Sequence, residues 1–394
     1  MTHNRANPVT IDADFASGSA GEIQCMSDGS FEITPKPETL PPWFQDKLDE
    51  FWDGGGVPKE YMFHVRCQNS SNATQPLSMR FLFSAAGQSY LALPWWIRRD
   101  RGWQQLADSE AAIQEKDNAY QHLDVSLTLN PNEVLYVGSA PYEDPEDVDL
   151  MTRSIAETLP GFSIREIGMT ARARPILALE STPRELRLLV VATMQACEPT
   201  WMGLHHAARA WATPHGEISK LAERVQLCVV PLSNPDGLAE GLSVTNAVGE
   251  VPKFSCHFAY NDEPTPLETL ALWNYMDQLR PQARIEIHAH FTHPDFPPSV
   301  GMHEIDAMPA SLRPLGRIVE MAIDGAYHQP GSLTRRVRID ARIPQHDVYG
   351  TREIADRFGI VSAFLQAVSD PMEAHQEDVL RCVRTIASAL TQTR

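Results

Sequence analysis

Polar residues that could bind a metal or exchange a proton follow several apolar runs in the second half of this 394-residue chain. Gln195 and Glu198 come shortly after one run, His288 ends a second, and Gln366 follows a third. Carboxylate, imidazole and amide groups that converge from separate strands can hold a divalent metal. We therefore take these residues as the candidate chemical centre of the protein.

The apolar runs are predicted to be the β-strands that position this centre. Their Val, Ile and Leu content is typical of strands buried on both faces of a sheet, and they occupy residues 188–193, 225–230, 285–288 and 360–365. Helical composition or spacing is found at 199–211, 266–279, 312–323 and 376–391. This alternation predicts an α/β fold with a mixed, mostly parallel sheet between helices. Such folds place their sites at the carboxyl ends of the strands.

The first part of the chain has a different pattern. Between Tyr61 and Tyr142, short β-like runs alternate with segments rich in Ser, Asn, Gly and Pro, which is typical of an antiparallel β-sandwich. An acidic stretch with two prolines follows at 141–147. It marks the predicted boundary between an N-terminal β-sandwich domain, residues 1–148, and an α/β domain, residues 149–394.

Charge and composition limit the classes of partner. Lys and Arg total 33 against 51 Asp and Glu, which gives a formal net charge of −18, so we expect neither nucleic acid nor a membrane surface as a partner. The amino terminus lacks the apolar segment of a secretory signal, and the six cysteines include no CxxC pair. We expect a cytoplasmic protein without a disulfide framework. The sequence leaves the oligomeric state open.

Four segments, in the same order, resemble motifs of the M14 zinc carboxypeptidases, and within them of the cytosolic carboxypeptidase and deglutamylase branch. Residues 193–201 are similar to that family's His-Pro-Gly-Glu-Thr segment with its later Trp, and 230–237 to its Val-Pro-x-x-Asn-Pro-Asp-Gly. Residues 285–290 resemble its Asp-Leu-His-Gly-His, and 359–366 the strand that ends in its catalytic Glu. The preceding β-rich part resembles the sandwich in front of that branch's peptidase domain. The resemblance implies the carboxypeptidase fold, a zinc cofactor and a peptide or amino-acid-derived substrate.

The same resemblance assigns roles to the candidate centre. Glu198 falls on the Glu ligand of the zinc and His288 on the second His ligand, while Gln195 stands at the first His ligand. Gln366 stands where the family has its general base, a Glu. An amide oxygen is a weak, neutral ligand that lowers the preference for zinc over harder ions. A carboxamide also does not titrate near neutral pH, so it cannot accept a proton from water as a carboxylate does.

The resemblance also places residues against the substrate. Asn234 lies in the Asn-Pro-Asp-Gly segment, which that branch follows with Gly-Asn-x-Arg and a further Arg. Here residues 241–246 end in Asn246, and only Lys253 lies nearby as a cation. Lys offers a point charge, whereas a substrate α-carboxylate suits the bidentate guanidinium group of Arg. Tyr349 lies where the M14 fold carries a mobile loop with a substrate-facing Tyr.

Residues close to the centre could replace the missing imidazole. Strand alternation puts Glu286, His288 and His290 on one face, so His290 is a candidate for contact with the metal or the substrate. Glu286 could equally pair with a neighbouring Arg or His as a buried group. Cys197, inside the first motif, could bind a metal, although a single buried Cys usually packs as a small apolar side chain.

Three hypotheses follow. The first, which we favour, is a divergent metallohydrolase that cleaves an amide or peptide bond of an amino-acid-type or peptide substrate through a metal-activated water. The second is a degenerate carboxypeptidase-like protein that binds a ligand or partner without hydrolysis, which would account for both glutamines. The third is an enzyme with redirected, non-hydrolytic chemistry in the same cleft, since a fold does not fix a function.

Overall fold

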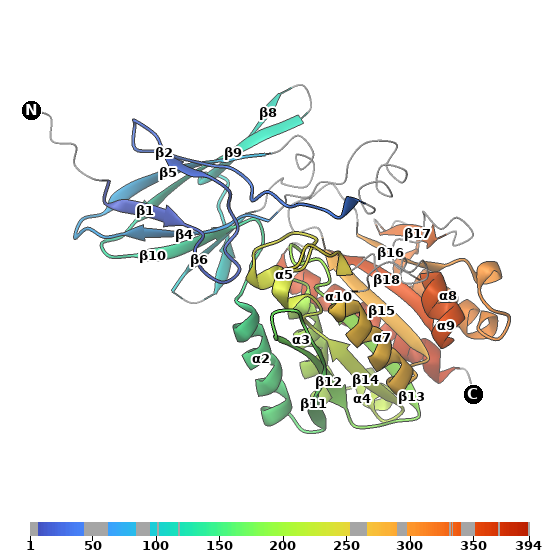
Figure 1. Ribbon diagram of the computed structural model, residues 1–394. Coiled ribbons are helices and arrows are strands. Elements are labelled where there is room, and N and C mark those ends of the chain that lie inside the picture. Colours follow the sequence, from blue (N-terminus) through green and yellow to red (C-terminus); the bar gives the residue numbers. More distant parts are fainter. Residues whose placement is uncertain are drawn as a thin grey trace, which may run out of the picture.

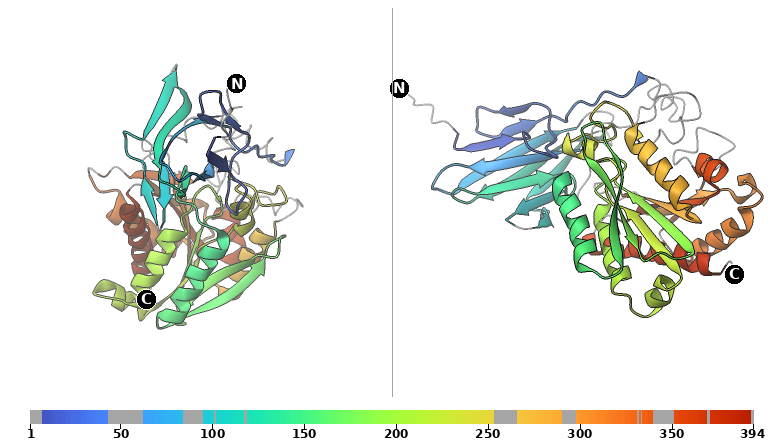
Figure 2. Two further views of the ribbon diagram at one scale, coloured as in Figure 1. Left: turned by 90° about the vertical axis from the view of Figure 1, so that its left-hand side faces the viewer. Right: turned by 60° about the horizontal axis from the view of Figure 1, so that its bottom comes forward.

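The computed structural model describes residues 7–42, 62–83, 95–100, 102–116, 119–252, 266–289, 298–330, 332, 334–339, 351–368 and 371–392. In this part of the chain, β-sheets make up the N-terminal portion, and a large sheet flanked by helices makes up the remainder (Figure 1). Two further views show the N-terminal sheets at one end of the α/β portion (Figure 2).

The N-terminal portion holds two five-stranded sheets. In spatial order, one sheet consists of β1 (Val9–Asp12), β4 (His64–Asn69), β10 (Val134–Gly138), β6 (Trp96–Arg99) and β7 (Trp103–Gln105). The other consists of β2 (Ile23–Cys25), β3 (Phe31–Ile33), β5 (Gln75–Leu82), β9 (Ala119–Leu129) and β8 (Ala111–Lys116). Neighbouring strands are antiparallel except β3 and β5, which are parallel.

Alternating side chains of the two sheets form one apolar core. In β5, Leu77, Met79 and Phe81 are buried and the residues between them are exposed, as the period of two in a half-buried strand requires. Val65 of β4 and Val137 of β10 belong to the same buried cluster, so both sheets contribute to it. The prediction of antiparallel sheets in this portion is confirmed. The predicted run at 90–93 lies outside the described residues.

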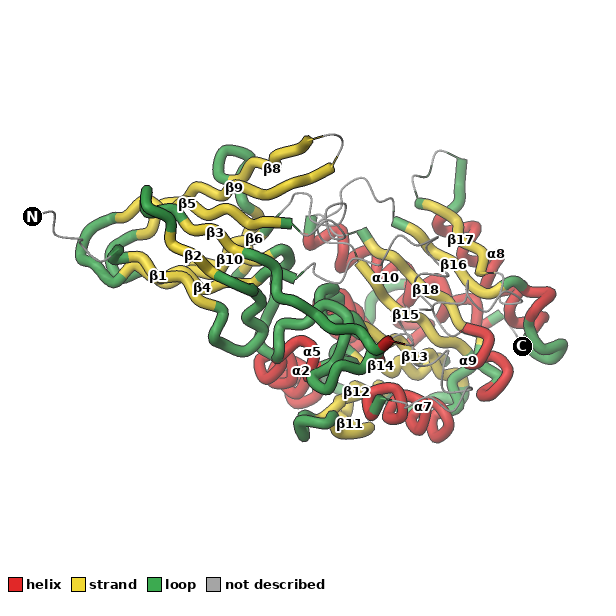
Figure 3. Tube along the Cα trace, turned by 45° about the horizontal axis from the view of Figure 1, so that its top comes forward, coloured by secondary structure: helices red, strands yellow, loops and turns green. Residues whose placement is uncertain are grey.

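An eight-stranded mixed sheet forms the centre of the second portion (Figure 3). Its spatial order is β11 (Phe162–Met169), β12 (Pro175–Ser181), β14 (Val225–Val230), β13 (Leu186–Ala192), β15 (Ala283–Ala289), β18 (Val361–Ala367), β16 (Ser299–His303) and β17 (Arg335–Ile339). The central strands β14, β13, β15 and β18 are parallel, and β11, β12 and β16 pair in the antiparallel direction. The predicted mixed α/β sheet is therefore confirmed.

Helices cover both faces of this sheet. One face packs against α2 (Pro145–Thr158), α3 (Trp201–Ala212), α8 (Arg313–Tyr327) and α10 (Met372–Thr391). The opposite face packs against α7 (Leu267–Leu279) and α9 (Thr351–Phe358). Shorter elements are α4 (Glu217–Ala222), α5 (Pro235–Ala239) and the 3-10 turn η3 (Ile305–Ala307). Within the described ranges, no helix combines the length and the apolar character that crossing a bilayer requires.

The helices differ from their predicted ranges mainly at their ends. α8 continues to Tyr327, four residues past the predicted end at 323, and the buried Tyr327 donates its hydroxyl to the carbonyl oxygen of Asp378 at 3.1 Å. α10 begins at Met372, earlier than the predicted 376, directly after Pro371. A proline is well tolerated at the start of a helix, where its missing N–H would have no intrahelical partner.

Candidate functional site

The carboxyl ends of β13, β15 and β18 bring the candidate residues to one edge of the sheet. The three strands are parallel neighbours, and His288 of β15 pairs in register with Gln366 of β18. The loop after β13 carries Gln195 and Glu198, and the side chain of Glu198 contacts that of His288. The structure thus brings together Glu198, His288 and Gln366, as expected from the strand ends of an α/β fold.

The loop that carries Glu198 begins with a strained residue. Thr193 has a φ of +51°, a left-handed conformation that is strongly disfavoured for a β-branched side chain and costs about 1–3 kcal/mol. Its N–H donates to Oγ1 of Thr200 at 3.1 Å, and the N–H of Glu198 donates to the carbonyl oxygen of Gln195 at 3.0 Å. Strain of this kind is concentrated at functional sites, and here it lies at the turn that follows β13.

His288 is held by a carboxylate on each side of its ring. Its Nδ1 lies 2.7 Å from Oε2 of Glu198, and its Nε2 lies 2.7 Å from Oε1 of Glu286. All three side chains are buried. A neutral imidazole has one N–H, so two such carboxylate contacts require one additional proton, on the ring or on a carboxyl group. The array therefore holds one more proton than a neutral imidazole between two carboxylates.

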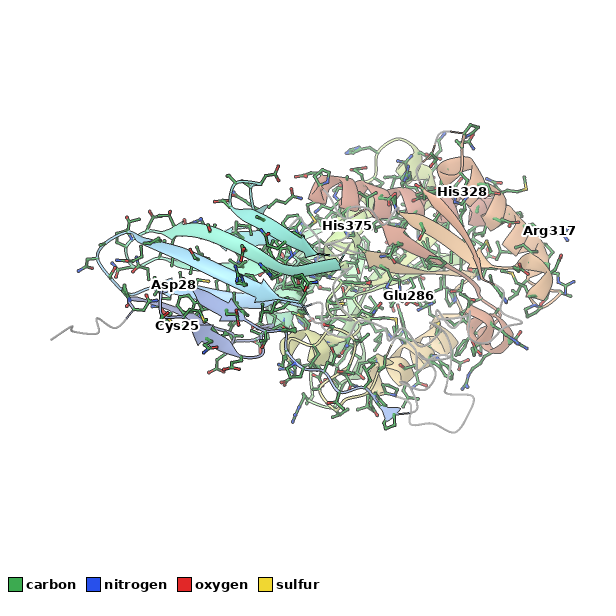
Figure 4. All side chains as sticks on the ribbon, turned by 90° about the horizontal axis from the view of Figure 1, so that it is seen from above. Cys25, Asp28, Glu286, Arg317, His328 and His375 are labelled. Atoms are coloured by element: carbon green, nitrogen blue, oxygen red, sulfur yellow. The ribbon has the colours of Figure 1, made fainter. Side chains whose placement is uncertain are left out.

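A buried cation completes this array. Arg284 donates from Nη2 to Oε2 of Glu286 at 2.6 Å and from Nη1 to Oγ of Ser362 at 3.4 Å. The side chains of Arg284 and Glu286 are each only 2% exposed. Glu286 therefore pairs with both an Arg and a His, and the predicted buried pairing is confirmed. Arg284 is not among the predicted site residues, although its spacing of two residues from Glu286 places both on one face of β15. Figure 4 shows Glu286 within the α/β portion, away from Cys25 and Asp28 of the N-terminal sheets.

The two glutamines predicted at the centre, Gln195 and Gln366, are both buried. Gln195 is 7% exposed and Gln366 is 6% exposed, so each amide is an enclosed part of the site. Neither amide can take up a proton near neutral pH, and neither adds charge to the centre. Hydrogen bonds join the ionisable side chains of Glu198, Glu286, Arg284 and His288 at this centre.

Two of the residues predicted to bind substrate hold the neighbouring loop. Asn234 precedes α5, where its Oδ1 accepts from the N–H of Gly237 at 2.9 Å and its Nδ2 donates to the carbonyl oxygen of Thr245 at 3.1 Å. Asn246 is also buried, and its Nδ2 donates to Oε2 of Glu268 at 3.0 Å. Burial raises the pKa of Glu268. These contacts give both asparagines a structural role, and their contact with a substrate remains a prediction.

Three other predicted residues, Lys253, His290 and Tyr349, lie outside the described residues. Their assigned contacts with substrate or metal remain predictions. Cys197 is described and buried; its N–H donates to the carbonyl oxygen of Ser243 at 3.3 Å, and its own carbonyl oxygen accepts from the hydroxyl of Tyr142 at 3.2 Å. These backbone contacts are the role that the structure gives to Cys197.

The carboxylate of Glu198 and the imidazole of His288 are suitable ligands for a divalent metal. They supply one imidazole, whereas the ligand set implied by the sequence resemblance has two imidazoles and one carboxylate. Glu198 and Nδ1 of His288 face each other, so one cation could bind both. Metal-binding histidines usually direct their second nitrogen to a carboxylate, and Glu286 supplies this carboxylate here. Across the described residues, no group of three His, Cys, Asp or Glu side chains has the arrangement of a metal site. In the sequence prediction a third ligand from this loop is the amide oxygen of Gln195, which favours harder ions.

Solved structures with a similar fold are metallo-carboxypeptidases. A metallo-carboxypeptidase from Burkholderia cenocepacia aligns with a TM-score of 0.71 and 16% identity, covering 98% of this chain and 98% of that chain. A metallo-carboxypeptidase from Pseudomonas aeruginosa, in complex with (2-guanidinoethylmercapto)succinic acid, aligns with a TM-score of 0.70 and 15% identity, covering 97% and 98%. Both alignments include the N-terminal sheets, because they span nearly the whole chain.

A more distant structure matches a smaller share of the chain. Carboxypeptidase A from Helicoverpa armigera aligns with a TM-score of 0.51 and 13% identity, covering 64% of this chain and 74% of that chain. No protein-family model matches the sequence, and no curated protein matches it. At these identities the likeness concerns the fold, and it confirms the fold that the sequence motifs predicted. The chain therefore has the fold of the metallo-carboxypeptidases, over both its sheet-rich and its α/β portions.

Proposed function

We propose that this protein is a divergent metal-dependent hydrolase that cleaves an amide or peptide bond of an amino-acid-type or peptide substrate. The observation that carries this proposal is the carboxylate–imidazole–carboxylate array of Glu198, His288 and Glu286 at the carboxyl ends of the central strands. The metallo-carboxypeptidase fold of the similar structures supports it. Zinc is the proposed metal, with a weakened preference over harder ions because Gln195 replaces an imidazole.

Each residue of the centre has a distinct proposed part. Glu198 and Nδ1 of His288 would hold the metal, and the amide oxygen of Gln195 would be the third protein ligand. Glu286 orients the imidazole through Nε2 and is itself neutralised by Arg284. A bound divalent metal supplies a Lewis acid that polarises a carbonyl group and acidifies water.

Gln366 limits the chemistry that this centre can perform. Its amide can donate a hydrogen bond to a substrate or accept one from a water, but it cannot accept a proton. General-base catalysis is typically worth about 10²–10⁴-fold, so we propose slow hydrolysis.

Substrate contacts are proposed for Asn234, Asn246, Lys253, Tyr349 and His290. We also propose the division into domains at 148/149 and a cytoplasmic location.

Metal content tests the proposal directly. Protein purified without chelator and without a nickel column is expected to contain about one zinc or other divalent ion per chain by elemental mass spectrometry. Glu198→Ala is expected to lose this metal, because it removes a charged ligand. The matched control Glu157→Ala changes an exposed glutamate of α2 and is expected to keep it. Protein that stays free of metal, even after incubation with excess zinc or manganese, would refute the hydrolase.

One observation favours a second candidate function. Gln366, which cannot act as a general base, is buried and lies opposite His288 in the register of β15 and β18. This candidate is a carboxypeptidase-like protein without peptidase activity, either a binding protein or an enzyme with redirected chemistry. It predicts that Glu198→Ala leaves the affinity for ligands of the cleft nearly unchanged. A large loss of that affinity, together with loss of metal, would favour the metal-dependent hydrolase over this second candidate.

A further inference from the structure

The loop that carries Glu198 receives a hydrogen bond from a tyrosine outside the α/β portion. Tyr142 lies between β10 and α2, in the stretch that the sequence suggested as a domain boundary, and is 1% exposed. Its hydroxyl lies 3.1 Å from Oγ of Ser139 and donates to the carbonyl oxygen of Cys197 at 3.2 Å. Cys197 directly precedes Glu198. The tyrosine hydroxyl therefore fixes the peptide that joins Cys197 to the proposed metal ligand.

The N–H of Cys197 is held indirectly by a second residue of the N-terminal portion. It donates to the carbonyl oxygen of Ser243 at 3.3 Å. The backbone of residues 243–245 is in turn gripped by Glu38, whose carboxylate accepts from the N–H groups of Ser243 at 2.9 Å, Val244 at 2.9 Å and Thr245 at 2.5 Å. Glu38 is buried, so these charge-assisted hydrogen bonds lie largely out of water.

Further contacts fasten the same loop to the N-terminal portion. Oγ of Ser19 donates to the carbonyl oxygen of Gly241 at 2.8 Å, and the backbone N–H of Met62 donates to Oγ of Ser243 at 3.2 Å. Lys36 Nζ donates to the carbonyl oxygen of Glu240. The loop that supports Cys197 is thus bound by several residues outside the large sheet. Among Ser19, Lys36, Glu38 and Met62, Glu38 is the buried charged residue.

We infer that Tyr142 and Glu38 of the N-terminal portion are positioning residues for Glu198. Tyr142 binds the carbonyl oxygen of Cys197 directly, and Glu38 binds the N–H of Ser243, whose carbonyl oxygen accepts from the N–H of Cys197. The loop lies beyond the end of β13, so no strand ladder fixes it. It starts at the strained Thr193, and such a conformation persists only where surrounding contacts determine it. The connections after β3 and β10 of the N-terminal portion therefore help to position the loop of Glu198. For the effect on metal binding, this inference rests on the proposed function.

The test compares two tyrosines that make the same kind of hydrogen bond. Tyr142→Phe removes the hydroxyl that donates to Cys197, and the control Tyr327→Phe removes an equally buried hydroxyl that donates to the carbonyl oxygen of Asp378 at 3.1 Å. Hydrogen exchange of the amides of Cys197 and Glu198 is measured on metal-free full-length protein, and the zinc dissociation constant by competition with a chelating dye. Both variants are compared with wild type.

In Tyr142→Phe we expect exchange at Cys197 and Glu198 to accelerate about tenfold, since one hydrogen bond to the loop is lost. The zinc dissociation constant is expected to rise about tenfold, the lower range for loss of an outer partner of a metal ligand. Tyr327→Phe is expected to change neither the exchange rates nor the zinc dissociation constant, although we expect its thermal midpoint to fall by about as much as that of Tyr142→Phe. Glu38→Gln, which removes the charge in the backbone nest, is expected to accelerate exchange in the same way.

Equal exchange at Cys197 and Glu198 in Tyr142→Phe and Tyr327→Phe would overturn the inference, as would faster exchange spread evenly over the whole chain. Unchanged zinc affinity in Tyr142→Phe, where wild type binds zinc, would also overturn it. Wild type that binds neither zinc nor manganese would refute the proposed function instead. The exchange comparison on metal-free protein would then decide the positioning role by itself.

Discussion

Gln366 is the residue at which one atom separates two kinds of chemistry. It lies opposite His288 in the register of β15 and β18, and its amide cannot accept a proton as a general base does. We expect Gln366→Glu to raise the rate of amide hydrolysis in metal-loaded protein by about 10²-fold or more, because a carboxylate can accept the proton of an attacking water. Release of amino acids from a peptide mixture, followed by mass spectrometry, measures this rate.

The matched control for this substitution is Gln226→Glu. Gln226 is also a buried glutamine in a strand of the same sheet, where its Nε2 donates to the carbonyl oxygen of Ser181 at 3.1 Å. It places the same charge in β14 without approaching Gln366, so hydrolysis is expected to stay at the wild-type rate. An unchanged rate in folded, metal-loaded Gln366→Glu would contradict the role of the missing base.

At the scale of elements, the close contact between α3 and α10 leaves no room for a larger side chain at Gly203 of α3. A Cβ added at Gly203 of α3 would lie 2.6 Å from Cγ2 of Val379 and 3.0 Å from Nε2 of His375, both on α10. We expect Gly203→Ala to destabilise the protein by about 1–3 kcal/mol, as overpacking does. The free energy of urea unfolding measures this loss.

Gly325 of α8 provides the comparison, because no atom lies within 4 Å of a Cβ added there. Gly325→Ala is expected to leave stability unchanged or to raise it by up to about 1 kcal/mol, since alanine has the higher helix propensity. Equal destabilisation of both variants would show that the close approach of α3 to α10 does not limit packing.

The sequence predicts the central parallel strands of this sheet well and β16 poorly. β13, β14, β15 and β18 are continuous apolar runs, so their type and their strand-end residues can be predicted. β16 reads Ser-Val-Gly-Met-His, and the glycine and polar ends of such a short segment give little strand signal. Its antiparallel pairing with β18 comes from tertiary contacts that no local pattern encodes.

The candidate site shows the same division between local and distant information. The contact of Glu198 with His288 follows from the rule for strand ends, and the pairing of Glu286 follows from alternation within one strand. Tyr142 and Glu38 could not be predicted in the same way. Their partners lie 55 and more than 200 residues away in sequence, and only the folded arrangement of the two portions brings them together.

At the scale of the whole molecule, buried neutral histidines predict sensitivity to acid in both portions. Burial lowers the pKa of His64 to about 3 in the N-terminal portion, and that of His205 to about 3 in α3. The unfolded chain takes up these protons below its ordinary pKa of 6.5, so stability is lost as the pH falls from 6.5 toward 3. Asp149, whose pKa burial raises to about 6, acts in the opposite direction, so the test compares variants.

We expect wild type to lose about 2 kcal/mol more stability than His205→Gln between pH 7 and pH 5. The unfolding free energy in urea at the two pH values measures this difference. The same measurement on His206→Gln, at a partly exposed position beside Glu377 in the same helix, controls for the loss of a histidine from α3. Parallel pH profiles for wild type and His205→Gln would show that the buried ring of His205 does not cause acid sensitivity.

The grip of Glu38 on the backbone of residues 243–245 also sets an order in time. Glu38 leaves the ribosome 205 residues before Ser243, which at roughly 5–20 residues per second is a delay of about 10–40 s. During this interval the strands of both N-terminal sheets are completed, whereas the backbone N–H groups that Glu38 binds are not yet synthesised. The loop of Glu198 can be locked only after synthesis has passed Thr245. The strands of the β-rich core are therefore complete before residues 243–245, through which Glu38 holds the loop of Glu198, have been synthesised.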